Sequence, residues 1–150
     1  MASTTGSSAQ TPAWPQPGAT VLFRGMLSLI FLVAGTGHLL NTEHIVERLL
    51  DAKYGFLATA VAPARPLVLL AGAVLLIGGL GLLLGYRTRW AALLLILVVI
   101  PITITIQIGR STLGPLFKNV AIMGGLLFFA THGAGPFSLE WSLQDRQEST

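Results

Sequence analysis

The chain has 150 residues, of which 53% are hydrophobic and only 10% are charged. Soluble globular domains carry about 25% charged residues, so this composition excludes an ordinary water-soluble protein and indicates a membrane protein. Nine Lys and Arg against six Asp and Glu give a net charge of +3, but the basic residues are spread singly along the chain. Nucleic-acid binding, which needs a concentrated cationic face, is therefore not expected. The sequence has no Cys, which excludes disulfides, thiolate zinc sites, iron–sulfur clusters and c-type haem attachment.

The first 20 residues are rich in Ser, Thr, Ala, Pro and Gly, carry no charge and have no periodicity, which predicts a flexible N-terminal tail. They lack the charged start, short apolar core and cleavage site of a signal peptide. The first apolar segment is therefore expected to remain in the mature protein as an anchor. Residues 141–150 are predicted to form a polar C-terminal tail.

Four apolar segments lie between these tails, at about residues 21–40, 66–85, 90–108 and 117–132. A bilayer core of about 30 Å needs about 20 helical residues, so the segments predict four transmembrane helices, of which the fourth is the shortest. Residues 100–108 alternate like a strand, but an isolated strand in hydrocarbon leaves its backbone groups unpaired. The expected fold is thus an all-α, polytopic, antiparallel four-helix bundle over residues 21–140, with a kink near Pro101.

The longest connection, residues 41–65, contains an amphipathic stretch. Its apolar residues at helical spacing are Ile45, Val46, Leu49 and Leu50, and its acidic residues are Glu43, Glu47 and Asp51. This pattern predicts a short helix at the membrane interface between spans one and two, capped by Asn41 or Thr42. A solvated connector and a lid or docking element both remain open as its role.

Four spans place both termini on one side of the membrane. That side carries four basic residues, Arg24, Arg87, Arg89 and Arg146, and the other carries five, Arg48, Lys53, Arg65, Arg110 and Lys118. The positive-inside rule is nearly balanced by these counts. We favour a multi-pass protein of the cell inner (plasma) membrane with both termini in the cytoplasm.

Small residues four positions apart predict close helix packing. Gly81 with Gly85 and Ala121 with Gly125 have this spacing, and they would serve either the bundle itself or a homo-oligomer. Arg24 lies one turn inside the first span and is expected to extend towards the lipid headgroups.

Two histidines on different spans first suggest a haem with two imidazole ligands. His38 ends an outgoing span and His132 ends a returning one, so they are expected on the order of 25 Å apart, across the hydrocarbon. Haem binding by one chain, and any metal site, is therefore not expected. No phosphate loop, nucleophile motif or pair of internal carboxylates occurs either, which leaves enzymatic activity by this chain alone without support.

Polar residues gather where the first and third spans end and the fourth begins. The candidate binding residues are His38, Gln107, Arg110, Lys118 and Asn119, with Thr103 and Thr105 beside them. Polar groups at the edge of a span tend to face the bundle or a water-filled cavity. A histidine with an amide suits a quinone, and Arg with Lys suits a small anion. The alternative is anchoring of helix ends, with snorkelling basic side chains and threonines bonded to their own helices.

Several segments together resemble the DoxX-like family of small four-helix membrane proteins. They are residues 29–38, which close the first span, residues 83–89, residues 118–125 and residues 135–140. The resemblance covers residues 21–140 and implies one of several roles that occur in the family: a small subunit of thiosulfate:quinone oxidoreductase, a membrane partner in a redox-stress assembly, or a part in cargo export or receptor assembly. Together with the polar residues, it leads us to expect a subunit or accessory of a membrane redox complex that binds no cofactor itself and helps to form a quinone or small-anion site. His38, Lys118 and Asn119 match polar positions that recur in the family.

Two other functions remain open beside this one. The first is a structural or assembly partner of another membrane protein, with no catalytic role; the second is a transporter, which the lack of a charge near the middle of the membrane disfavours. The expected partners are the lipid bilayer, another membrane or membrane-associated protein, and a second copy of the chain, but no nucleic acid.

Overall fold

Helices make up most of the described part of this chain, as the sequence predicts for an all-α protein. The computed structural model describes residues 17–108, 113–135 and 137–142, and no strand occurs among them. The elements, in chain order, are α1 (Pro17–Leu40), α2 (Thr42–Leu50), α3 (Gly55–Thr59), α4 (Ala64–Leu84), α5 (Thr88–Ile102), the π-helix η1 (Thr103–Gln107) and α6 (Gly114–His132). The predicted tails lie mostly outside the described residues, although the last four residues of the N-terminal one form the start of α1.

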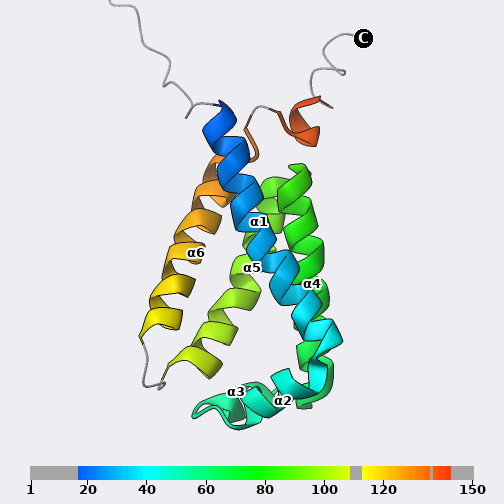
Figure 1. Cartoon of the computed structure of the whole chain (residues 1–150), viewed down its shortest axis with the longest axis vertical. Coiled ribbons are helices and arrows are strands. Elements are labelled where there is room, and N and C mark those ends of the chain that lie inside the picture. Colours follow the sequence, from blue (N-terminus) through cyan, green and yellow to red (C-terminus); the bar gives the residue numbers. More distant parts are fainter. Residues whose placement is uncertain (1–16, 109–112, 136, 143–150) are drawn as a thin grey trace, which may run out of the picture.

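The four long helices run antiparallel and form a bundle (Figure 1). The start of α1 and the end of α6 lie at one end, which we call the terminal end, whereas α2 and α3 lie across the opposite end, which we call the connector end. The predicted four-helix bundle with a short helix between the first two spans is confirmed.

Four helices are long and apolar enough to cross a membrane: Pro17–Leu40, Ala64–Leu84, Thr88–Gln107, which joins α5 to η1, and Gly114–His132. Each begins earlier than predicted because its first turn contains small or polar residues that are helical without being apolar. The sides of the bundle expose large apolar residues, among them Leu22, Val33, Ile77 and Leu97. Such a surface is unsuited to water but matches lipid chains. The chain is therefore a multi-pass membrane protein.

Glycines bring α1, α4 and α5 close together. A Cβ atom on Gly35 of α1 would lie 2.9 Å from the carbonyl oxygen of Gly72 in α4, and one on Gly72 would lie 2.8 Å from Cβ of His38. On another side of α4, Gly78 makes room for Leu95 of α5. Because lipid provides no hydrophobic drive for helix association, such close van der Waals contact is the main source of stability here.

In each pair of small residues that the sequence analysis names, only one member lies at a close contact between helices. Gly81 faces Ala91 of α5, and Gly125 faces side chains of α1. Ala121 is exposed, and Gly85 lies just beyond α4, at its C-cap. The homo-oligomer face stays a prediction.

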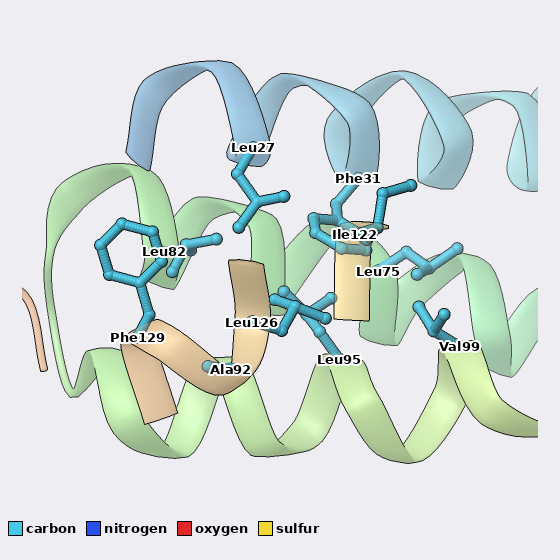
Figure 2. Close-up of a cluster of buried hydrophobic side chains, with 10 residues drawn as sticks. All are labelled: Leu27, Phe31, Leu75, Leu82, Ala92, Leu95, Val99, Ile122, Leu126 and Phe129. Carbon is cyan, nitrogen blue, oxygen red and sulfur yellow. The ribbon is translucent and has the colours of Figure 1, made fainter. Parts of the chain in front are cut away.

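The hydrophobic core lies along the bundle axis and receives side chains from all four long helices (Figure 2). Its buried members are Leu27, Phe31, Leu75, Leu82, Ala92, Leu95, Val99, Ile122, Leu126 and Phe129. These side chains are buried against one another, and such packing fixes the helices relative to one another.

The predicted connector helix is present as α2. Asn41, one of the two residues predicted to cap it, occupies the N-cap position, but its side chain makes no hydrogen bond to the helix. The Thr42 hydroxyl instead donates to the carbonyl oxygen of His38, at 2.8 Å, and so satisfies the end of α1. Glu43 forms an exposed ion pair with Arg65 at the start of α4, 3.4 Å between Nη2 and Oε1. The connector is thus joined to both neighbouring spans.

The third span changes from α-helix to π-helix after Pro101. Thr103 and Thr105 donate hydroxyl hydrogen bonds to the carbonyls of Val99 and Pro101, at 2.7 and 2.8 Å. The backbone N–H of Ile108 reaches the carbonyl of Thr103 at 3.2 Å, five residues back, which is the π-helical pattern. The span thus changes its helix type just beyond Pro101, near which a kink is predicted, and the strand-like alternation is helical, as expected in a membrane.

Arg24 does not extend to the headgroups, so that prediction is wrong. The side chain is only 4% exposed, and its guanidinium donates to the carbonyl oxygens of Ala134 and Phe137, each at 3.0 Å. Gly85, with φ of +68°, leaves room for this guanidinium, since a Cβ there would lie 2.6 Å from Nη1. The N–H of Glu140 also donates to the Gly85 carbonyl, at 3.2 Å. Two hydrogen bonds inside the protein thus replace the contacts with headgroups.

Candidate functional site

A cavity of about 320 Å³ lies at the connector end of the bundle, among α1, α2, α4, α5, η1 and α6. Its apolar wall includes four residues of the hydrophobic core: Phe31, Leu75, Val99 and Ile122. Its polar lining consists of His38, Arg48, Gln107, Lys118 and Asn119. We call it the connector-end cavity. An apolar hollow with a few convergent polar groups is the usual form of a small-molecule site.

The structure brings together four of the five candidate residues that the sequence indicated. His38 comes from the end of α1, Gln107 from η1, and Lys118 and Asn119 from the start of α6. Arg110 lies outside the described residues. The antiparallel order of the helices explains this convergence, because the ends of α1 and η1 and the start of α6 all lie at the connector end.

His38 has one ring nitrogen engaged within α1. Nδ1 lies 2.8 Å from the carbonyl oxygen of Ala34, one turn earlier. A carbonyl oxygen can only accept, so Nδ1 carries the hydrogen in this bond. In the neutral ring Nε2 is then an acceptor, and it makes no hydrogen bond with any residue that the structure describes.

Asn119 is 8% exposed and is held by a short chain of hydrogen bonds. Its Nδ2 donates to the hydroxyl oxygen of Thr103 at 2.9 Å, and that hydroxyl donates onward to the carbonyl of Val99 at 2.7 Å. The single hydrogen of Thr103 is used in the second bond, so the hydroxyl must accept from Asn119. This fixes the orientation of the amide. Asn119 therefore positions α6 against the third span and does not cap a helix.

Gln107 ends η1 and lies half-buried at the connector-end cavity. Its Oε1 is buried and accepts no hydrogen bond from the described residues. A buried carbonyl oxygen without a donor is costly, and in native proteins such groups often mark a position where a water or a ligand binds.

Arg48 also lines the cavity, and the sequence reasoning missed it. From the sequence, Arg48 is counted only among the basic residues on the side of the membrane opposite the termini. The spacing nevertheless indicates its position, because Ile45, Arg48 and Leu49 are three and four residues apart and so share one face of α2. Leu49 is buried, and Ile45 lines the same cavity.

A second cavity, of about 340 Å³, lies at the terminal end and is lined by His132, Arg89 and Glu140, among others. His38 and His132 thus belong to cavities at opposite ends of the bundle, so the two imidazoles do not meet. Within the described ranges, no group of three or more His, Cys, Asp and Glu could hold a metal ion.

These features define a small polytopic helix-bundle protein of the membrane, with an amphipathic connector and a polar-lined cavity beneath it. The chain belongs to the DoxX family, whose model matches residues 19–108, more than half of the sequence. The match covers α1 to η1 and includes His38 and Gln107, whereas Lys118 and Asn119 lie beyond it. No curated protein and no solved structure matches the chain.

Proposed function

We propose that this protein is a subunit or accessory of a membrane redox complex and that its connector-end cavity holds the head of a quinone. The observation that carries the proposal is the make-up of this cavity: an apolar wall of core residues with His38, Gln107 and Asn119 gathered on it. The oxidised and reduced forms of a quinone both combine an apolar ring and tail with two polar oxygens, and so match a hollow that has an apolar wall, polar side chains and the cations Arg48 and Lys118.

The volume of the cavity suits a single ring. Small-molecule sites range from about 300 to 1,000 Å³, and the connector-end cavity, at about 320 Å³, lies at the lower end of that range. A head group of one ring fits such a space, with its tail leaving towards the lipid.

In this proposal the chain binds and orients the quinone, while a partner protein carries the electrons. The sequence has no Cys, so no thiol of this chain takes part in the redox chemistry. Nor do the two histidines His38 and His132 share a cavity. The partner would therefore supply the redox group, as expected of an accessory subunit.

The first test is purification in a gentle detergent from the native membrane, with mass spectrometry of co-eluting proteins and analysis of the extracted lipid for quinone. We expect a partner in fixed ratio that carries a redox group, together with bound quinone. A chain that elutes without partner or quinone would contradict the proposal.

Substitutions separate this proposal from a purely structural role. With His38→Ala we expect quinone-linked turnover to fall at least tenfold per assembled complex, while the amount of complex stays near that of the wild type. Asn119→Ala should lower turnover per assembled complex in the same way, although it also removes a hydrogen bond that holds α6 against the third span. His132→Ala, at the other end of the bundle, is the matched control and should leave turnover unchanged. If the variants lower the amount of complex but not the activity of what assembles, the chain is an assembly partner.

A further inference from the structure

Three side chains of the connector-end cavity each carry an acceptor atom that no hydrogen bond uses among the described residues. They are Nε2 of His38, Oδ1 of Asn119 and Oε1 of Gln107. We infer that the cavity selects a ligand that donates hydrogen bonds, so that the reduced, hydroxyl-bearing form of a quinone binds more tightly than the oxidised form. This inference rests on the proposed function and names which member of the redox couple the site favours.

His38 is an acceptor because its own helix fixes the tautomer. The Ala34 carbonyl takes the hydrogen of Nδ1, at 2.8 Å. Moving that hydrogen to Nε2 would leave two acceptors facing each other at this distance, which is unfavourable. The neutral ring therefore offers a lone pair to a ligand: it can accept from the hydroxyl of a quinol but has nothing to donate to the carbonyl of a quinone.

Asn119 is oriented by the same kind of constraint. Because Thr103 uses its only hydrogen on Val99, the Asn119 amide turns Nδ2 towards Thr103 and keeps Oδ1 away from it. Reversing the amide would place its oxygen 2.9 Å from a hydroxyl that has no hydrogen left to donate. The Asn119 oxygen is thus a second acceptor on the wall of the cavity.

Gln107 adds a third acceptor, since its buried Oε1 has no donor in the described part of the chain. A ligand hydroxyl at this position would remove the cost of that unpaired oxygen, whereas a ligand carbonyl would pair with Gln107 only if the amide turned over to present Nε2. The three acceptors come from α1, η1 and α6. The preference is therefore a property of the assembled cavity and not of one helix.

The charges that line the cavity favour a hydroxyl over an ammonium group as the hydrogen-bond donor of the ligand. Arg48 and Lys118 line it, and two cations disfavour an ammonium group as the donor. A hydroxyl, in contrast, donates its hydrogen to an acceptor such as His38 and accepts from these cations through its oxygen. A quinone carbonyl can only accept hydrogen bonds from the cations and cannot donate one to His38.

The test compares both redox forms of one probe on the full chain in phosphatidylcholine nanodiscs. The probe is decylubiquinone, used oxidised and, under anaerobic conditions, as decylubiquinol, with both affinities measured by equilibrium dialysis. We expect the quinol to bind about tenfold more tightly, the effect of one or two additional hydrogen bonds. Equal affinities, or tighter binding of the quinone, would overturn this inference but leave the proposed function standing. If neither form binds, the proposed function fails.

A variant of His38 tests whether this residue is the main cause of the preference for quinol. In His38→Leu we expect the affinity for quinol to fall about tenfold and the affinity for quinone to change little, so that the preference disappears. His132→Leu is the matched control and should retain the preference of the wild type. If His38→Leu retains it as well, His38 is not the acceptor and the inference is wrong. The comparison of the two forms on the wild type decides the question even if His38→Leu does not fold.

Discussion

Arg24 shows how one residue fixes the terminal end of the bundle. It is buried within a span, and its guanidinium bonds to the carbonyls of Ala134 and Phe137. We predict that Arg24→Met weakens folding by roughly 2–4 kcal/mol, because it leaves two carbonyls without their charged donor. Unfolding by denaturing detergent measures the loss, and hydrogen exchange should show faster opening of residues 133–142.

The control for this prediction removes the same charge at the same end. Arg87 is exposed, so Arg87→Met should leave both stability and exchange close to the wild type. Equal effects of the two substitutions would mean that charge, and not the hydrogen bonds of Arg24, holds the C-terminal segment.

Most of the candidate site could be predicted from the sequence, because the parity of the spans decides which residues reach the same end. That reasoning brought His38 and Asn119 together, although they are far apart in the chain. Span parity does not show, however, which face of a helix a residue lies on. For this reason it missed Arg48 and gave the wrong environment for Arg24. Both depend on which face of a helix meets its neighbours, and this is decided by packing.

At the scale of helices, the contact between α1 and α4 depends on a lack of side chains. A Cβ on Gly35 would meet the backbone of Gly72 and of Leu76, neither of which can move aside like a flexible side chain. We predict that Gly35→Ala destabilises the protein by roughly 1–3 kcal/mol through overpacking, measured by the same detergent unfolding.

The matched control is Gly25→Ala in the same helix. Nothing lies within 4 Å of a Cβ at Gly25, so alanine there should be neutral or should stabilise by about 0.5–1 kcal/mol through its higher helix propensity. A loss of similar size in both variants would indicate a general sensitivity of α1 and not a contact with α4.

The π-helix η1 could not have been predicted from its residues. Ile and Thr alternate through residues 102–106, a pattern typical of a strand, and only the membrane argues for a helix. The shift from α to π depends on Pro101, which has no N–H, and on the threonine hydroxyls that bond to nearby carbonyls. The hydrogen bond between Thr103 of η1 and Asn119 of α6 could therefore not be predicted from the sequence.

At the scale of the whole molecule, the number and order of the spans follow from hydropathy and are confirmed. The pairing of helices is a different matter, since four apolar segments are compatible with several arrangements. The glycines between α1 and α4 and between α4 and α5 select the observed one. The spacing of small residues predicts close packing, but not which helix each glycine faces.

The four-span topology also predicts which sites are reachable from each side. Because the chain has no Cys, single cysteines can be introduced in the exposed positions Ala60→Cys, at the connector end, and Tyr86→Cys, at the terminal end. Neither substitution alters the charges that guide orientation. We expect a membrane-impermeant maleimide to label one of them in intact cells and the other only after permeabilisation.

The parent chain, without cysteine, is the control for background labelling. If the termini are cytoplasmic, Ala60→Cys is the variant labelled from outside. Labelling of both from the same side would contradict the antiparallel arrangement.

The partners of Arg24 have a consequence for biosynthesis. The first carbonyl that it bonds lies 110 residues later in the chain, so the arginine enters the bilayer on α1 long before that carbonyl has been synthesised. Until then we expect the guanidinium to remain near water or lipid phosphate, with α1 displaced towards the membrane surface. In that case α1 reaches its final position only after Ala134 and Phe137 have been synthesised, so that a segment late in the chain completes the insertion of the first helix.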